Sequence, residues 1–467
     1  MANVSETTLE NTPTWAVATV CFILIVISIL IEHLLHLLSK YFKRKRKKSL
    51  FEALEKIKSE LILLGFTSLL LTVSEKHIAN ICIPKSVGET LLPCASMTFD
   101  YDEEETKCAE QGKISLLSRE GVRQLQYFIF YLALYHVISC ILTFSLGMAK
   151  MRHWASWEAE TTTLEYQISY DPRRFQLTHQ TSFGKRHLNY WSNNPLLYWP
   201  VCLVRQFYKS VSKVDYFTLR HGFIMARFSE GSNFDFQKYI RRALEKDFEV
   251  VVGISWWIWI FSVLYIFFNA NAFSSHFWLP FIPLMVLLLV GTKLQGIITD
   301  MCLDSHDNSL VVRGTLLVKP SDHFFWFGWP KLLLHLISFI LFQNSFQLAF
   351  FTWSSIRFGI RSCFHHETEN IIIRVVMGVL VQILCGYVTL PLYALVTQMG
   401  TSMSNVVFTE NVIRGIHIWH DKAKKNVALR NPYSQRSTLH TSLETSPSFR
   451  FDDAPVSISV DRSLIRS

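Results

Sequence analysis

The chain contains none of the short motifs that mark common enzyme sites. It has no nucleophile motif, no phosphate-binding loop and no zinc-ligand spacing, although sites of these kinds require such local patterns. It also has no internal repeat, which argues against the transporters that are built from inverted repeats. We therefore expect a protein without enzymatic activity, without a cofactor and without a metal site.

Charged residues are scarce, whereas apolar residues are abundant. Only 18% of the 467 residues are charged, while 50% are apolar and 36 are phenylalanine. This composition is typical of membrane proteins. The sequence predicts an all-α integral membrane protein with seven transmembrane helices, because seven apolar segments are long enough to cross a bilayer. These segments are 15–38, 61–79, 125–148, 250–268, 277–298, 330–351 and 371–396.

The positive charges orient these segments. Lys40 and the run KRKRKK at 43–48 follow the first segment, and lysine and arginine beside a span stay in the cytosol. Residues 1–14 should therefore be extracellular, and an odd number of spans places the C-terminus in the cytosol. Because its basic flank follows it, the first segment resembles an uncleaved anchor and not a cleaved signal peptide. The net charge of +9 gathers beside the spans, which favours an anionic leaflet over nucleic acid as its partner.

The two long loops agree with this orientation. Residues 80–123 carry an acidic patch at 100–105 and three cysteines, as expected outside the cell, whereas the loop 149–249 is rich in Arg and Lys. Arg357 and Arg361, between the sixth and seventh segments, are exceptions to the charge rule.

The predicted cytosolic loop is also rich in aromatic residues. Such a loop has enough apolar surface to dock on the helices or to form a small subdomain. Short helices are expected at 200–211 and 235–246, and Asn233 or Asp235 would cap the second.

Four of the nine cysteines, Cys82, Cys94, Cys108 and Cys363, fall in predicted external loops, where thiols oxidise. They can form two disulfides in three connectivities. We favour Cys94 with Cys108, which closes a short loop around the acidic patch, and Cys82 with Cys363, which both lie near span ends. Four free thiols are the alternative. The other five are expected to be packing residues: Cys21, Cys140, Cys202, Cys302 and Cys385.

Several blocks of the sequence resemble the plant MLO (mildew resistance locus O) family, in the same order. They are PTWAVATVC at 13–21, LFEALEKIK at 50–58, THQTSF at 178–183, KVDYFTLR at 213–220, VGTKL at 290–294 and PLYALVTQMG at 391–400. The resemblance covers about residues 12–430. It implies a plasma-membrane protein with seven spans, an external N-terminus, four extracellular cysteines and a calmodulin-binding tail. Members of the family are associated with calcium-permeable channel activity, powdery mildew susceptibility and polarised growth.

A basic amphipathic helix is expected at 403–430. Its apolar positions are Phe408, Val412, Ile416 and Trp419, and its positive charges include Arg414, Lys422, Lys424 and Lys425. A helix of this kind suits the groove of calcium-loaded calmodulin, although a helix lying along the inner leaflet has the same chemistry. Gly415 stands where the family usually has Ala and costs about 1 kcal/mol of helix propensity. Residues 431–467 are Ser- and Thr-rich without periodicity, and we expect them to be disordered.

A calcium pore would need oxygen ligands near or within the membrane. Three carboxylates are candidates for an ion path, and four polar side chains add oxygens within the last two spans. The carboxylates are Glu32, Glu75 and Asp300, and the polar side chains are Gln343, Asn344, Gln347 and Gln382. The structural alternative is that each is an interfacial or interhelical hydrogen-bonding residue.

A receptor or scaffold that signals through calmodulin without conducting ions is the second functional interpretation. Seven spans in this orientation also describe G-protein-coupled receptors. Those receptors, however, carry Asp-Arg-Tyr at the cytosolic end of the third span, where this chain reads Gly-Met-Ala-Lys at 147–150.

Overall fold

The structure is a computed structural model. It describes residues 14–88, 108, 112–169, 175–208, 210–228, 234–269, 281–308, 311–313, 318–359 and 368–400. These residues belong to one compact unit, Met1–Val407. Residues 1–13 and 401–467, which include the predicted extracellular N-terminus and the predicted calmodulin-binding and tail segments, lie outside the described residues.

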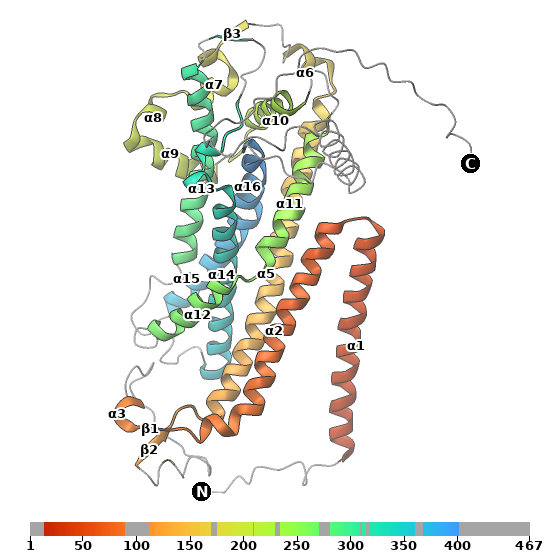
Figure 1. Cartoon of the computed structure of the whole chain (residues 1–467), viewed down its shortest axis with the longest axis vertical. Coiled ribbons are helices and arrows are strands. Elements are labelled where there is room, and N and C mark those ends of the chain that lie inside the picture. The colour runs from red at the N-terminus through yellow and green to blue at the C-terminus, as the bar shows by residue number, and fades with distance from the viewer. Residues whose placement is uncertain are drawn as a thin grey trace, which may run out of the picture. The chain divides into compact units, whose positions relative to one another are not determined.

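Long apolar helices dominate the described chain (Figure 1). Six of them are long and apolar enough to cross a membrane, and a seventh span results if one bent pair is counted as one. Each of the seven predicted segments overlaps one of these helices, which confirms an all-α membrane architecture. Residues 277–280 of the fifth segment lie outside the described residues, and the fourth is interrupted at 253–255. The helices are α1 (Thr14–Arg44), α2 (Lys48–Ala79), α5 (Arg119–Glu160), the pair α11 (Phe236–Val252) and α12 (Trp256–Asn269), α13 (Phe281–Asn308), α14 (Pro330–Phe358), and α15 (Thr368–Ile383) continued by a π-helical turn (Leu384–Thr389) and α16 (Leu390–Val396).

Helix starts follow the local sequence. The Ser118 hydroxyl accepts a hydrogen bond from the Gly121 N–H at the start of α5, and Asp235 caps α11 through the Lys238 N–H at 2.9 Å. The prediction that Asp235 caps a helix is therefore confirmed. Pro330 occupies the first turn of α14, where its missing N–H costs no helical hydrogen bond.

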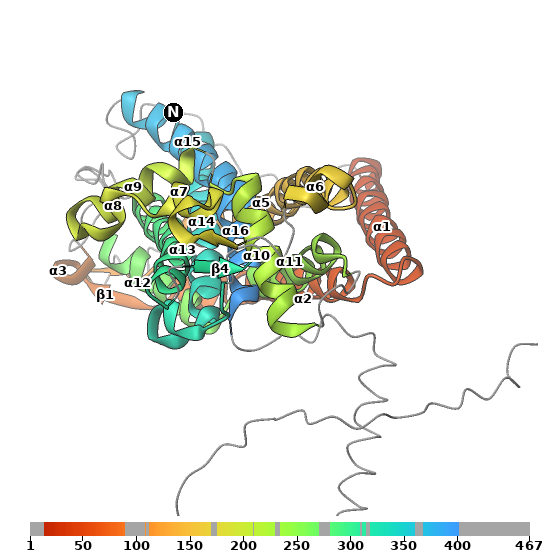
Figure 2. The ribbon, with the colours of Figure 1, turned by 90° about the horizontal axis from the view of Figure 1, so that it is seen from above.

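Helix α5 is the central element of the bundle and packs against α14, α2, α11 and the π-helical turn. Helix α1 packs against α2 and stands apart from the other long helices in both views (Figures 1 and 2). Most of its side chains are exposed and apolar. In a membrane protein we expect such a surface to face lipid.

Short elements gather at the two ends of the bundle. At one end, which we call the disulfide end, β1 (Cys82–Pro84) pairs antiparallel with β2 (Lys113–Ser115) beside α3 (Lys85–Gly88). At the opposite end, the loop end, lie α6 (Leu164–Ser169), α7 (Ser182–His187), α8 (Tyr190–Asn193), α9 (Pro195–Phe207) and α10 (Lys213–Arg227) (Figure 1). There β3 (Phe175–Leu177) pairs antiparallel with β4 (Val311–Arg313). The described residues also include four short 3-10 helices: Thr178–Gln180, Asp322–Phe324, Trp326–Gly328 and Thr397–Met399.

Two hydrophobic clusters, both containing aromatic rings, form the core of the described chain. The larger joins the loop 149–249 to the bundle, because Trp154, Tyr216, Phe223 and Phe236 are buried with residues of α13, α14 and α16. The smaller includes Phe128 and Phe346, whose rings meet edge to face at 5.3 Å between α5 and α14. The aromatic loop therefore packs on the helices.

Candidate functional site

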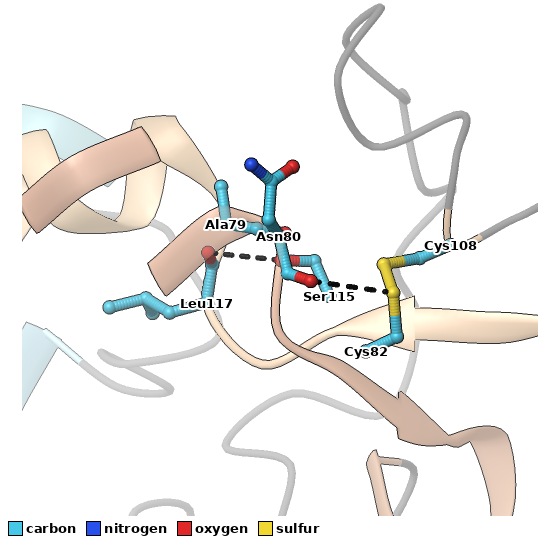
Figure 3. Close-up of a disulfide and its surroundings, with 6 residues drawn as sticks. All are labelled: Ala79, Asn80, Cys82, Cys108, Ser115 and Leu117. Carbon is cyan, nitrogen blue, oxygen red and sulfur yellow. Dashed lines mark hydrogen bonds between the residues drawn. A yellow bond between two sulfur atoms is a disulfide. The ribbon is translucent and has the colours of Figure 1, made fainter. Parts of the chain in front are cut away.

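A disulfide links strand β1 to the segment that precedes β2 at the disulfide end (Figure 3). Cys82, which lies opposite Ser115 in the strand pair, is bonded to Cys108 with their Cα atoms 5.5 Å apart. The Ser115 hydroxyl donates to the Ala79 carbonyl at 2.8 Å, at the end of α2. Together these contacts tie the end of α2 to the chain that leads into α5.

The expected cysteine pairing was wrong. Cys82 is bonded to Cys108, so neither Cys94 with Cys108 nor Cys82 with Cys363 can form. The shorter loop of the Cys94–Cys108 alternative gave it little advantage, since each doubling of loop length costs only about 0.6 kcal/mol of closure entropy. The pairing of β1 with β2 decides the connectivity by returning the chain to Cys82. Cys94 and Cys363 lie outside the described residues.

The structure does not bring the three candidate carboxylates together. Glu32 is an exposed residue of α1. Glu75, near the disulfide end of α2, forms an ion pair with Arg119 at 3.8 Å. Asp300 lies toward the loop end of α13, where it accepts a hydrogen bond from the Tyr198 hydroxyl and faces Lys293 at 3.8 Å.

A buried polar network does form within the bundle, among α5, α14 and α15. The Ser139 hydroxyl donates to the side-chain oxygen of Gln382 at 2.9 Å, and the Gln382 amide donates to Thr143 at 2.8 Å. The Asn344 amide donates to the Gly378 carbonyl at 3.1 Å. Two of the four polar residues named from sequence, Asn344 and Gln382, thus meet in one network.

Gln343 is buried and directly precedes Asn344 in the sequence, but its side chain takes no part in this network. Its side chain is 0% exposed, and neither its amide nitrogen nor its amide oxygen has a hydrogen-bond partner among the described residues. An unpaired amide in an apolar interior costs free energy. Such a group therefore calls for an explanation beyond packing.

The helix that carries Gln382 changes from α-helical to π-helical geometry. A π-helical turn, Leu384–Thr389, begins shortly after Gln382, and π-helical turns occur frequently at functional sites. Gly386 permits its close approach to α5, because a Cβ atom there would lie 3.1 Å from the Thr143 Cα.

The predicted fourth span is broken. Instead of one helix over 250–268, α11 and α12 meet at a bend of 45°. The Ser338 hydroxyl of α14 hydrogen-bonds to the Val251 and Gly253 carbonyls, each at 3.2 Å. From α2, the Glu60 carboxylate accepts from the Ile254 N–H at 3.2 Å. Side chains of two other helices therefore satisfy three of the backbone groups at the break, as a membrane interior favours.

Neither this break nor its two supporting side chains was predicted from the sequence. The one local signal is Gly253 with Ser255 inside an apolar segment. Glu60 stands just before the predicted second span, yet its side chain is buried and also pairs with Lys56 at 3.5 Å.

A second buried network holds the loop end together. His187 of α7 hydrogen-bonds to Asp215 of α10 at 3.0 Å and to Thr299 of α13 at 3.1 Å. Arg186 faces the second Asp215 oxygen at 3.1 Å, and the Ser212 N–H donates to it at 2.9 Å. The network joins two loop helices to a membrane span.

Burial and pairing shift the pKa values of this network. Burial lowers the pKa of His187, although the hydrogen bond to Asp215 opposes that shift. Burial alone would raise the pKa of Asp215, but the His187 hydrogen bond, the nearby positive charges and the Ser212 N–H together hold it below its ordinary value. Although Thr299, His187 and Asp215 resemble a hydrolase triad, all three are buried, so the arrangement is a structural one.

Apolar helices that cross a membrane and pair their polar groups inside the bundle define a multi-pass α-helical membrane protein. The chain belongs to the Mlo family, whose sequence model matches residues 6–105 and 96–461. It is 49% identical to MLO-like protein 6 of Arabidopsis thaliana, over 99% of this chain and 87% of the relative. It is 44% identical to MLO protein homolog 1 of Oryza sativa subsp. japonica, over 97% of this chain and 89% of the relative. No solved structure matches.

Proposed function

We propose that this protein is a seven-span plasma-membrane protein of calcium signalling that conducts calcium under the control of calmodulin. In a plant, that role would serve pathogen defence, including powdery mildew susceptibility, or polarised growth. Family membership supports the proposal, and we expect no enzymatic activity. The observation that carries the conduction hypothesis is the polar interior of the bundle. There the Gln343 amide, which has no partner within the described part of the chain, lies beside Asn344 in the same helix.

The proposed orientation has the N-terminus outside the cell and the C-terminus in the cytosol. Helix α2 supports it, because the basic run 43–48 lies at one end of this helix and the Cys82–Cys108 disulfide lies just beyond the other. Lysine and arginine favour the cytosolic side, whereas disulfides persist on the oxidising side. Two independent rules therefore agree on the direction of one helix. In this orientation the bent pair α11–α12 counts as one span, which gives seven.

Oxygen ligands support calcium as the permeant ion. Calcium prefers carboxylate, carbonyl and amide oxygens, and the interior holds the side-chain oxygens of Gln343, Asn344, Gln382 and Thr143. Glu75 and Asp300, near opposite ends of the bundle, would then act at the two mouths of a path and not at a shared site. Both are paired with cations in the structure, Arg119 and Lys293, so conduction would require these pairs to open.

Calcium imaging of Gln343→Leu in a heterologous cell tests the proposal. Leucine has a similar size and removes an unpaired buried amide, so a merely structural role predicts equal or higher stability. A role in conduction instead predicts reduced calcium influx at unchanged surface abundance. Ser345→Ala is the matched control, since the Ser345 hydroxyl bonds to the Leu341 carbonyl of its own helix at 2.9 Å. Influx that is normal in Gln343→Leu would contradict the assignment of this amide to the path.

The alternative is a receptor or scaffold that binds calmodulin without conducting ions. It is favoured by the pairing of Ser139, Thr143 and Gln382 with one another, because paired polar groups also suit a sealed bundle. Purified protein in liposomes separates the two functions. Calcium flux supports the channel, whereas calmodulin binding without flux supports the receptor.

A further inference from the structure

Helix α9, in the loop 149–249, exposes a continuous apolar face. Leu196 is 88% exposed, Val204 61% and Phe207 51%. Leu197, Trp199 and Leu203 extend the same surface. The helix contains one charged residue, Arg205. This residue is turned inward, where its guanidinium donates to the Arg186 carbonyl at 2.9 Å and contacts His187 at 3.2 Å. A surface of this kind is seldom left in water.

The opposite face of α9 packs against the membrane span α13. The Tyr198 hydroxyl donates to the Gly296 carbonyl at 2.9 Å and to Asp300. Further along α9, Gln206 lies against Gly291, where an added Cβ would come within 2.0 Å of the Gln206 side-chain oxygen. As α9 runs from Tyr198 to Gln206, its contact with α13 therefore moves away from the loop end.

The depth of this contact along α13 places α9 at the level of the membrane. Helix α13 begins at Phe281, and Gly291 lies about 15 Å further along its axis, at about 1.5 Å per residue. The hydrocarbon core of a bilayer is about 30 Å thick. Near the loop end, the exposed aromatics Phe327 and Trp329 precede α14 and suit the lipid–water boundary.

The lipid-facing surface of α13 continues onto α9. Met285 and Leu289 of α13 are exposed and apolar, 65% and 51% respectively. Figure 1 shows α8 and α9 beside the part of α13 nearest the loop end. A helix satisfies its own backbone hydrogen bonds, so α9 can enter hydrocarbon where an irregular loop could not.

We propose that α9 is embedded in the membrane leaflet at the loop end, with its apolar face against lipid acyl chains. The part of the predicted cytosolic loop that lies between α5 and α11 is then a membrane-anchored element and not a wholly cytosolic one. In this position α9 also shields Lys293 and Asp300, which face one another at 3.8 Å in α13, from the surrounding lipid. A charged pair at membrane depth is costly unless protein covers it, and the hydroxyl of Tyr198 provides a polar contact on the covering side.

Site-directed labelling of the full-length protein in lipid nanodiscs tests the proposal. Val204→Cys carries an environment-sensitive fluorophore, Leu289→Cys is the lipid-facing control, and Lys185→Cys, an exposed residue of α7, is the aqueous control. The background variant is Cys21→Ala, because Cys21 is the exposed thiol among the described free cysteines. This background must take up no label before the three sites are compared.

The proposal predicts that lipids with brominated acyl chains quench most of the fluorescence of the label at positions 204 and 289. The same lipids should quench little of the fluorescence of the label at position 185. Aqueous iodide should quench Lys185 alone. Quenching of Val204 by iodide, as at Lys185, would overturn the proposal. If Val204 were shielded in native membrane vesicles but open to iodide in nanodiscs that contain lipid only, a protein partner would cover this face, and the lipid assignment would be wrong.

Discussion

His187 and Asp215 show how one buried pair can make the loop end sensitive to acid. Because burial lowers the pKa of His187 in the folded protein, protonation below its ordinary value of about 6.5 favours the unfolded chain. The pKa of Asp215 is also lowered, so its stabilising contribution is present above its ordinary value and is lost as the pH falls through its folded value. Both pKa shifts therefore predict lower stability in acid. As the pH falls, the effect of His187 comes first, because the ordinary pKa of histidine is higher than that of aspartate.

The corresponding variant is His187→Gln, which keeps a hydrogen-bonding side chain but cannot titrate. We expect the midpoint of thermal unfolding of the wild-type protein to fall between about pH 7.5 and about pH 5.5, and the fall to be smaller in the variant. Intrinsic fluorescence of the protein in nanodiscs would measure both midpoints. An equal fall in the two proteins would show that groups other than His187 govern the acid response.

The Cys82–Cys108 connectivity at the disulfide end can be tested with cysteine variants. Removing a native disulfide typically costs about 2 to 5 kcal/mol, so Cys82→Ala and Cys108→Ala should each lower the abundance of the protein at the cell surface. Because both cysteines belong to one bond, the double variant should be no worse than either single variant. Surface biotinylation measures the three variants, with Cys21→Ala as the unpaired control. A double variant with clearly additive loss would contradict the Cys82–Cys108 pairing.

The predicted helix at 403–430 carries the regulatory hypothesis. Trp419→Arg places a charge in an apolar groove and should abolish calcium-dependent binding of a peptide of this segment to calmodulin. Binding of the same peptide to anionic vesicles should survive better, since each added positive charge contributes about 1 kcal/mol there. Calorimetry against calmodulin and against vesicles separates the two interpretations. Equal calmodulin binding by the wild-type and variant peptides would remove the basis for regulation through this segment.

Helices were easier to predict from the sequence than their interruptions. Each of the seven apolar segments overlaps a long helix within the described residues, because hydropathy averaged over a span is a strong signal. The same averaging hides the break at Gly253, which depends on Ser338 and Glu60, residues far away in the sequence. The helix expected at 200–211 begins instead at Pro195 and ends at Phe207. Its contact with α13 depends on tertiary packing, and the sequence does not encode that contact locally.

The orientation of the whole chain is the most direct prediction of the seven-span arrangement. If the bent pair α11–α12 crosses the membrane once, the number of spans is odd and the termini lie on opposite sides. An epitope at residue 2 should then be accessible to antibody on intact cells, whereas one after Ser467 should become accessible only after permeabilisation. If the bent pair instead enters and leaves on one side, six spans remain and both epitopes share a side. Immunofluorescence with and without detergent therefore distinguishes a broken span from a re-entrant one, and the location of the disulfide end outside the cell depends on the same result.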